Sequence, residues 1–296
     1  MVAGQKAGSH VIRPFETMQE FHSCVELQEQ TWGLGFSERV PTAILKVSQI
    51  LGGVAAGAYS EDGDLEGFVF GMTGIRDGQL VHWSDMLAVI EHARDAGLGT
   101  QLKAYQREQV LARGVEKMLW TFDPLQSRNA YLNFVKLGIV VQEYVESMYG
   151  ETDSPLHQGV GTDRFVALWE LTSLRASRRL AGSKPPAQPS EHATQVLPEA
   201  GRYSLPEPGV PDLESEEREV LVAIPSDIVQ LMNLDIGLAG RWREATRETL
   251  VHYMSKGYEV QEIFWGERTS DYLLVQPGMP RPDTKLRTRS GERPLV

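Results

Sequence analysis

The sequence predicts an α/β fold, with α+β character and a mixed sheet. Segments with strand patterns alternate with segments whose apolar residues recur at helical spacing. The loop "SEDGD" between two strand patterns contains the Asp-Gly pair typical of a hairpin. The chain has 296 residues, enough for one large or two modest domains. We expect a first domain over 9–172, a linker or wrapped arm over 176–217, a β-α-β-β subdomain over 218–276 and a flexible tail over 277–296.

Each element of the first part has its own local signal. "SHVIRPFE" has a strand pattern, and the helical pattern that follows has Thr17 as a plausible N-cap. A second short helix is expected to begin at Pro41 and to stop at Gly52. The next three strands are then "GVAAGAYS", "LEGFVFGMTGI" and "QLVHWSDMLAV".

The later elements alternate in the same way. "EKMLWTFDP" is expected to be a strand, "SRNAYLNFVKLG" a helix that stops at Gly138, and "VVQEYVESMYG" and "RFVALWEL" strands. The segment 176–217 is rich in Pro, Ser, Ala and Glu, which is typical of a linker. Beyond it we expect the strand "EVLVAIP", a long helix from about Ser226 to Lys256, and the strands "YEVQEIFW" and "DYLLVQ".

The segment "LAVIEHARDAGLGTQLKAYQ", residues 87–106, joins a strand to a helix through Gly97 and Gly99. A helix start has backbone N–H groups without partners, glycine allows a ligand to approach them, and the helix dipole favours an anion. The turn is therefore a candidate phosphate site. It is neither a dinucleotide fingerprint, because Leu102 replaces the third glycine, nor a Walker A loop, because Thr100 follows Gly99. A tight turn used only for packing is the alternative.

Bulk composition restricts the partners. A net charge of −11 argues against a general nucleic-acid binder, so an anionic ligand would need a local basic pocket. The single cysteine, Cys24, excludes an internal disulfide and favours the reducing cytoplasm. We expect no secretory signal, no membrane span and no metal, and a homodimer is left open.

The residues around the glycines resemble a known family. Arg94, Gly97 and Gly99 match the Q/R-x-x-G-x-G/A motif of the GNAT superfamily of acyl-CoA-dependent N-acyltransferases. The motif follows a strand and opens a helix, and "SRNAYLNFVKLGI" is similar to the second motif of the family. The resemblance covers about residues 9–172 and implies the GNAT fold, with the C-terminal subdomain as an extension found in a bacterial subgroup.

The resemblance implies an acyl-CoA, most simply acetyl-CoA, as co-substrate. The CoA diphosphate would lie on the turn, whose expected cofactor-binding residues are Arg94, Asp95, Ala96, Gly97, Leu98, Gly99 and Thr100. Arg94, Lys103 and Arg128 would add positive charge. Backbone N–H groups near Leu87, Ala88 and Val89 would bind the thioester carbonyl. Ser127 and Asn129 would hydrogen-bond to pantetheine, unless Ser127 is only the N-cap of its helix.

The implied reaction is direct transfer of an acyl group to a primary amine, which needs a base. Strand alternation places Trp83, Asp85, Leu87 and Val89 on one face, and His82, Ser84, Met86 and Ala88 on the other. We expect Asp85 to be the base, directly or through water, with Trp83 beside the substrate; a carboxylate that only holds a neighbouring loop is the alternative. His82 is the weaker candidate, more typical of a structural histidine.

The proton donor departs from the family pattern. The family often has a tyrosine where this chain has Phe134, which cannot donate a proton. Tyr131, on the same face of that helix, is the expected substitute, and Tyr144 and Tyr149 are further candidates.

The acceptor is expected to be a small metabolite such as an amino acid. His157 and Arg164 would bind it, with Arg164 on a substrate carboxylate or else in a local ion pair with Asp163 or Glu170. Arg243 and Arg247 are expected on an exposed helix face beside Glu244 and Glu248, with recognition of an anionic patch as the alternative. The competing functions are a non-catalytic acyl-CoA-binding or scaffolding protein and an N-succinyl-type acyltransferase.

Overall fold

The computed structural model describes residues 5–7, 10–34, 36–94, 97–150, 160–201 and 205–278. The strands are β1 (Gln5–Ala7), β2 (His10–Pro14), β3 (Val54–Tyr59), β4 (Leu65–Arg76), β5 (Gln79–Val89), β6 (Lys117–Phe122), β7 (Val140–Val145), β8 (Arg164–Glu170), β9 (Thr194–Leu197), β10 (Glu199–Ala200), β11 (Glu207–Pro208), β12 (Glu219–Pro225), β13 (Glu259–Phe264) and β14 (Thr269–Val275). The helices are α1 (Met18–Trp32), α2 (Thr42–Ile50), α3 (Leu98–Leu111), α4 (Ser127–Tyr131), α5 (Leu174–Leu180), α6 (Ile228–Leu234) and α7 (Ile236–Ser255), with a 3₁₀ turn η1 (Glu91–Ala93) and a π-helical segment η2 (Leu132–Leu137).

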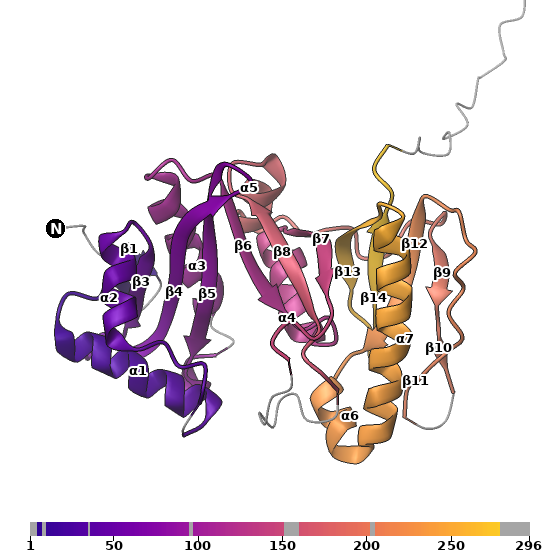
Figure 1. The fold of residues 1–296 in the computed structure, drawn as a ribbon, viewed down its shortest axis with the longest axis horizontal. Coiled ribbons are helices and arrows are strands. Elements are labelled where there is room, and N and C mark those ends of the chain that lie inside the picture. The colour runs from indigo at the N-terminus through magenta and orange to yellow at the C-terminus, as the bar shows by residue number, and fades with distance from the viewer. Residues whose placement is uncertain are drawn as a thin grey trace, which may run out of the picture.

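One sheet runs through both halves of the chain (Figure 1). Its strand order is β1-β2-β3-β4-β5-β6-β8-β7-β13-β14-β12-β9. The pairs β5–β6 and β9–β12 are parallel and the hairpin β4–β5 is antiparallel, so the sheet is mixed. The predicted mixed α/β class is confirmed.

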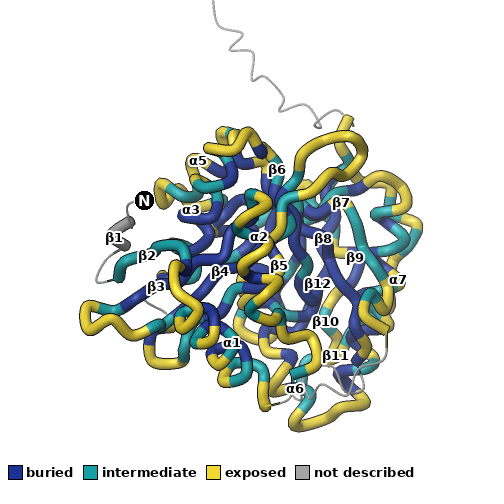
Figure 2. Tube along the Cα trace, turned by 60° about the vertical axis from the view of Figure 1, so that its left-hand side comes forward, coloured by how far each residue is buried: buried dark blue, intermediate teal, exposed yellow. Residues whose placement is uncertain are grey.

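Helices cover the two faces of this sheet in different regions. On one face, which we call the α1 face, Phe21 of α1 and Leu45 of α2 pack with Phe68 of β4. The other, the α3 face, carries one continuous core that includes Leu102 of α3 and Trp242 of α7. Burial of both apolar clusters drives the layers together. Figure 2 shows the middle of β4 and most of β8 buried while the loops around them are exposed.

Local capping signals place several helix ends where the sequence predicts them. Thr17 is the N-cap of α1, as expected, and it also forms a capping box with Glu20. The predicted single helix over 226–256 is instead two helices, because Asp235 caps α7 with its side chain and ends α6.

Several described parts of the segment 176–217 pack against the C-terminal half. Its strand β9 pairs in parallel with β12 at one edge of the sheet. Trp242 and Tyr253 of α7 donate hydrogen bonds to the carbonyl oxygens of Pro206 and Asp212, at 2.7 and 2.8 Å. These contacts fix the chain at Pro206 and Asp212 along α7.

Candidate active site

Strands β5 and β6 lie side by side but pair at only two positions. His82 is opposite Met118 and Trp83 is opposite Leu119; beyond these positions the strands diverge, as Figure 1 shows. We call the diverging region, which begins at Ser84, the splay. A strand edge that lacks a partner offers N–H and C=O groups to an extended ligand.

The chain leads from the open end of the splay to the start of α3. Gly97 is the N-cap residue, with a left-handed φ of 78° and no capping side chain. A Cβ atom at Gly97 would meet nothing within 4 Å, so the outside of the turn is open. The first intrahelical bond runs from the Gln101 N–H to the Gly97 carbonyl, so the preceding N–H groups can bind an anion. Asp95 and Ala96 lie outside the described residues.

The three cationic side chains predicted around this turn lie in different environments. Arg94 is exposed, and its Nε donates to the Val89 carbonyl oxygen at 3.0 Å. Arg128 is exposed, with its guanidinium 3.9 Å from an Asp227 carboxylate oxygen. Lys103 was expected beside the diphosphate, and this is wrong: its side chain is buried beneath the sheet.

A β-bulge in β5 changes the predicted faces of the strand. Phe70 is opposite Met86 while Gly71 is opposite Ser84, so Asp85 is the extra residue. The bulge reverses the alternation, and the prediction that Trp83, Asp85, Leu87 and Val89 share a face is wrong. Before the bulge His82 and Ser84 face α3, and after it Leu87 and Val89 do so, whereas Met86 and Ala88 join the core of the α1 face.

Asp85 is open to solvent yet surrounded by protein. Its accessible surface makes it exposed, while neighbouring protein partly desolvates its carboxyl group and raises the pKa of that group. A hydrogen bond from the Trp83 side chain lowers this pKa and the negative charge of Glu38 raises it. An accessible carboxyl group with a raised pKa is suited to general-base catalysis.

His82 has a structural environment, as expected for the weaker candidate. It is fully buried, and burial together with the charge of Lys103 lowers its pKa to about 3. The Gln106 amide donates to its Nε2 at 3.0 Å, and Nδ1 is 3.1 Å from the Thr73 hydroxyl. The imidazole is therefore neutral and lies on the α3 face, away from Asp85.

Across the splay, polar side chains gather on the same face as Asp85. Thr121 of β6 alternates with Trp120, which faces α3, so Thr121 points to the α1 face. Its hydroxyl lies 2.9 Å from the Tyr149 hydroxyl, and the Arg164 guanidinium lies over the Tyr149 ring at 5.2 Å. Arg164 also donates to the Asp163 carbonyl oxygen at 3.0 Å. His157 lies outside the described residues.

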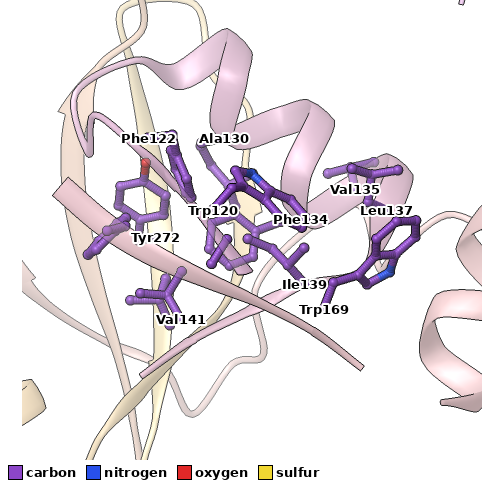
Figure 3. Close-up of a cluster of buried hydrophobic side chains, with 14 of the residues drawn as sticks. Trp120, Phe122, Ala130, Phe134, Val135, Leu137, Ile139, Val141, Trp169 and Tyr272 are labelled. Carbon is purple, nitrogen blue, oxygen red and sulfur yellow. The ribbon is translucent and has the colours of Figure 1, made fainter. Parts of the chain in front are cut away.

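The second predicted motif has become part of the core between the two halves. Phe134 is fully buried, with its ring 6.2 Å from Phe122 and 5.8 Å from Tyr272 (Figure 3). Tyr131 packs edge-on against Trp265 at 5.9 Å. Tyr144 donates its hydroxyl hydrogen bond to Asp163, which holds it in place.

Two further residues of this motif, both predicted to hydrogen-bond to pantetheine, have hydrogen bonds within the protein. The N-cap residue of α4 is Gln126, so the alternative role of Ser127 as a cap is wrong. The Ser127 hydroxyl donates instead to the carbonyl oxygen of Ser226 in the C-terminal half. Asn129 is exposed, and its side-chain oxygen accepts a hydrogen bond from Asn133 at 3.3 Å.

Arg243 and Arg247 do not form the exposed face that the sequence predicts. Arg243 is 3% exposed and donates to both carboxylate oxygens of Asp123 at 2.7 Å. Arg247 bonds both oxygens of the buried Asp163, at 2.7 and 2.8 Å. Charged residues of α7 therefore join the C-terminal half to the loops that flank the splay. Sequence periodicity missed this because both carboxylates are distant along the chain.

The comparisons with known proteins concern the fold of part of the chain. No protein-family model and no curated protein matches it. A structure of the NatC complex bound to Gag peptide and CoA matches with 14% identity and a TM-score of 0.45, over 55% of this chain and 99% of that chain. The ribosomal-protein-S18-alanine N-acetyltransferase from Escherichia coli matches with 14% identity and a TM-score of 0.42, over 55% and 95%.

A third solved structure, an acetyltransferase of the GNAT family from Streptococcus pneumoniae, gives a similar result. It has 17% identity and a TM-score of 0.44, over 54% of this chain and 98% of that chain. These values are too low to indicate an activity or an acceptor. Among the described residues, none of the helices is long and apolar enough to span a membrane, and no group of three His, Cys, Asp or Glu side chains forms a metal site.

Proposed function

We propose that the chain is a GNAT-type, acyl-CoA-dependent N-acyltransferase. One observation supports this most strongly: the splay between β5 and β6 opens beside the uncapped start of α3, and Asp85 lies at the closed end of the same strand edge. An extended ligand with a diphosphate at one end and a reactive carbonyl at the other fits this arrangement.

In this proposal the cofactor crosses the sheet. The CoA diphosphate lies on the N–H groups from Gly97 to Thr100, with Arg94 near it. Pantetheine pairs with the unpaired edge of β5, and an N–H group in Leu87–Val89 binds the thioester carbonyl and stabilises the oxyanion. The diphosphate is thus on the α3 face, and the acyl group points to the α1 face.

Asp85 then acts on the acceptor amine. An amine attacks a thioester only in its neutral form, so its proton must leave before or during the attack. The Asp85 carboxylate accepts this proton, directly or through water. Its raised pKa makes it a better base than an ordinary aspartate at neutral pH.

The acceptor in this proposal is the primary amine of a small metabolite such as an amino acid. Arg164 and Tyr149 lie across the splay from Asp85, and a guanidinium there suits a substrate carboxylate. The acyl group is acetyl in the simplest case, and succinyl is the alternative that an acyl-CoA panel would identify.

Two measurements on the full chain test the proposal. Calorimetry should show CoA binding, and a thiol assay should show CoA release from acetyl-CoA in the presence of some members of a panel of amines. Binding without turnover over a broad panel would instead favour a non-catalytic acyl-CoA-binding protein. Failure to bind CoA would contradict both functions.

Substitutions at two glycines, Gly99 and Gly74, make the CoA-binding test more specific. In Gly99→Ala the new methyl group lies at an ordinary 3.7 Å from Leu87, so the fold should tolerate it, but it narrows the proposed cradle. We expect CoA affinity to fall at least about tenfold. Gly74→Ala, in open space on β4, is the matched control and should change nothing. Gly97 is a poorer choice because its positive φ would strain any replacement.

A further inference from the structure

A lysine is buried directly behind the splay. Lys103 of α3 is 5% exposed, and its Nζ donates to the Ser84 hydroxyl at 2.7 Å. The same Nζ lies 3.7 Å from the centre of the Trp120 ring. Ser84 and Trp120 are the first residues of β5 and β6 after the last paired position, so the amine bridges the two strands where they begin to separate.

The polar groups behind Lys103 form a chain of hydrogen bonds in which each group donates to the next. Lys103 donates to Ser84, Ser84 donates to the Gln106 side-chain oxygen at 2.8 Å, and the Gln106 nitrogen donates to His82. The neutral His82 then donates from Nδ1 to Thr73, whose hydroxyl donates to a backbone carbonyl at 3.0 Å. Each member except Lys103 thus has a partner on both sides.

Lys103 differs because no carboxylate of the described residues forms an ion pair with it. Burial lowers its pKa well below the ordinary value for lysine. His82 is the titratable group that faces it from β5, and it is neutral. An ammonium ion in such a site is costly unless an anion arrives from outside the protein.

The proposed path of CoA places an anion there during the reaction. Breaking a thioester leaves a thiolate, which is the strongest negative charge to develop near the splay. Pantetheine that runs from the start of α3 along the edge of β5 brings the sulfur to the acyl end of this path, beside Asp85 and next to the point where β5 and β6 separate. Lys103 approaches that point from the α3 face, where Phe134 has no polar atom to offer.

We propose that the Lys103 ammonium pairs with the CoA sulfur as the thioester is broken and so stabilises the leaving thiolate. This inference rests on the proposed function. The acceptor nitrogen forms a bond to the carbonyl carbon, the carbon–sulfur bond breaks, and its electron pair stays on sulfur. The Lys103 ammonium forms an ion pair with this thiolate, which takes a proton from solvent as CoA leaves. Asp85 takes the proton that the acceptor nitrogen loses and passes it to solvent after the products leave.

The test measures the ionisation of bound CoA and needs no knowledge of the acceptor. Thiolate absorbs in the ultraviolet more strongly than thiol, so a pH titration of the complex with CoA, corrected for the protein alone, gives the midpoint of thiol ionisation. With Lys103 nearby, the midpoint in the wild type should lie at least about one pH unit below that of free CoA. In Lys103→Met it should return to the value of free CoA or above.

Controls separate this effect from general charge and folding effects. Lys117→Met removes a lysine of β6 that bonds Gln79 at the surface, and it should keep the wild-type midpoint. If Lys103→Met does not fold, Lys103→Gln replaces it. A wild-type midpoint equal to that of free CoA, or one unchanged by loss of Lys103, would overturn the assignment. Absence of CoA binding would instead remove the proposed function, and this inference with it.

Discussion

Asp85 combines a backbone irregularity with an altered ionisation. The bulge removes it from the β4–β5 ladder, while the protein around it raises its pKa. In Asp85→Asn the acyl-transfer rate should fall by roughly 10²- to 10⁴-fold, the usual contribution of a general base. CoA affinity measured by calorimetry should be nearly unchanged, because Asp85 lies at the acyl end of the proposed path and not beside the diphosphate. An unchanged rate would remove Asp85 from the mechanism.

The pH profile gives an independent control for the same residue. The base is active when ionised, so the rate should be lost as pH falls through the raised pKa of Asp85. Glu38→Gln removes a negative charge that raises this pKa. The acidic limb of the profile should therefore move to lower pH in Glu38→Gln and be absent from the residual rate of Asp85→Asn.

At the residue scale, the sequence predicts which side chains matter better than where they point. Asp85 and the glycine turn are visible as local patterns, whereas one extra residue in β5 reverses the faces of Leu87 and Met86. Lys103 fits the helical pattern of α3 as a surface cation, and only the pairing of β5 with β6 shows that it is buried. Period-two reasoning fails at a bulge because the partner strand, rather than the local sequence, sets the register.

At the element scale, β4 is shaped by the polar groups that β5 and α3 bring to it. A Cβ atom at Gly71 would clash with His82 and would lie 2.6 Å from the Trp83 carbonyl oxygen and 2.8 Å from the Gln106 amide nitrogen. Gly71→Ala should therefore lower the free energy of unfolding by about 1–3 kcal/mol, the usual cost of overpacking. Chemical denaturation would measure this.

The same strand supplies the control for that prediction. A methyl group added at Gly74 would meet no atom within 4 Å, and the residue has no positive φ, so Gly74→Ala should be neutral or slightly stabilising. Equal stability of the two variants would contradict the tight packing of β4 against His82 and Gln106.

Helix boundaries show where element prediction succeeds and where it does not. Thr17 caps α1 and Asp235 caps α7, and the side chain of each accepts a hydrogen bond from a backbone N–H group. Only Thr17 comes before the start of a helical pattern in the sequence. Asp235 lies inside a continuous apolar pattern, which hides the break between α6 and α7. An aspartate within such a pattern can be recognised as an N-cap only once the structure shows that one helix ends there and another begins.

At the scale of the whole molecule, the two halves share one sheet. Strand β13 pairs with β7 at Val260 and Val141, so the outer edge of the N-terminal strands is covered by the same chain. A homodimer would therefore have to use another surface, and it stays a prediction. The domain boundaries also stay predictions, since the core of the α3 face is continuous across them.

Buried ion pairs hold the halves together beside the splay. Asp123 ends β6, and its partner Arg243 on α7 is almost fully enclosed. Removing one member leaves an unpaired buried charge, so Arg243→Met should cost about 3–5 kcal/mol of unfolding free energy. The double variant, Arg243→Met with Asp123→Asn, should cost less unfolding free energy than the sum of the two single variants, because it leaves no unpaired buried charge.

The exposed pair Arg76–Glu143 provides the comparison for this last prediction. Its side chains are 45% and 44% exposed, so Arg76→Met should cost less than about 1 kcal/mol. Denaturant unfolding of Arg243→Met, Asp123→Asn, the double variant and Arg76→Met measures all four effects. If Arg243→Met were as mild as Arg76→Met, the ion pair would not join the halves. If it also weakened CoA binding, then docking of α7 would help to hold the end of β6 apart from β5, because Asp123 directly follows that strand.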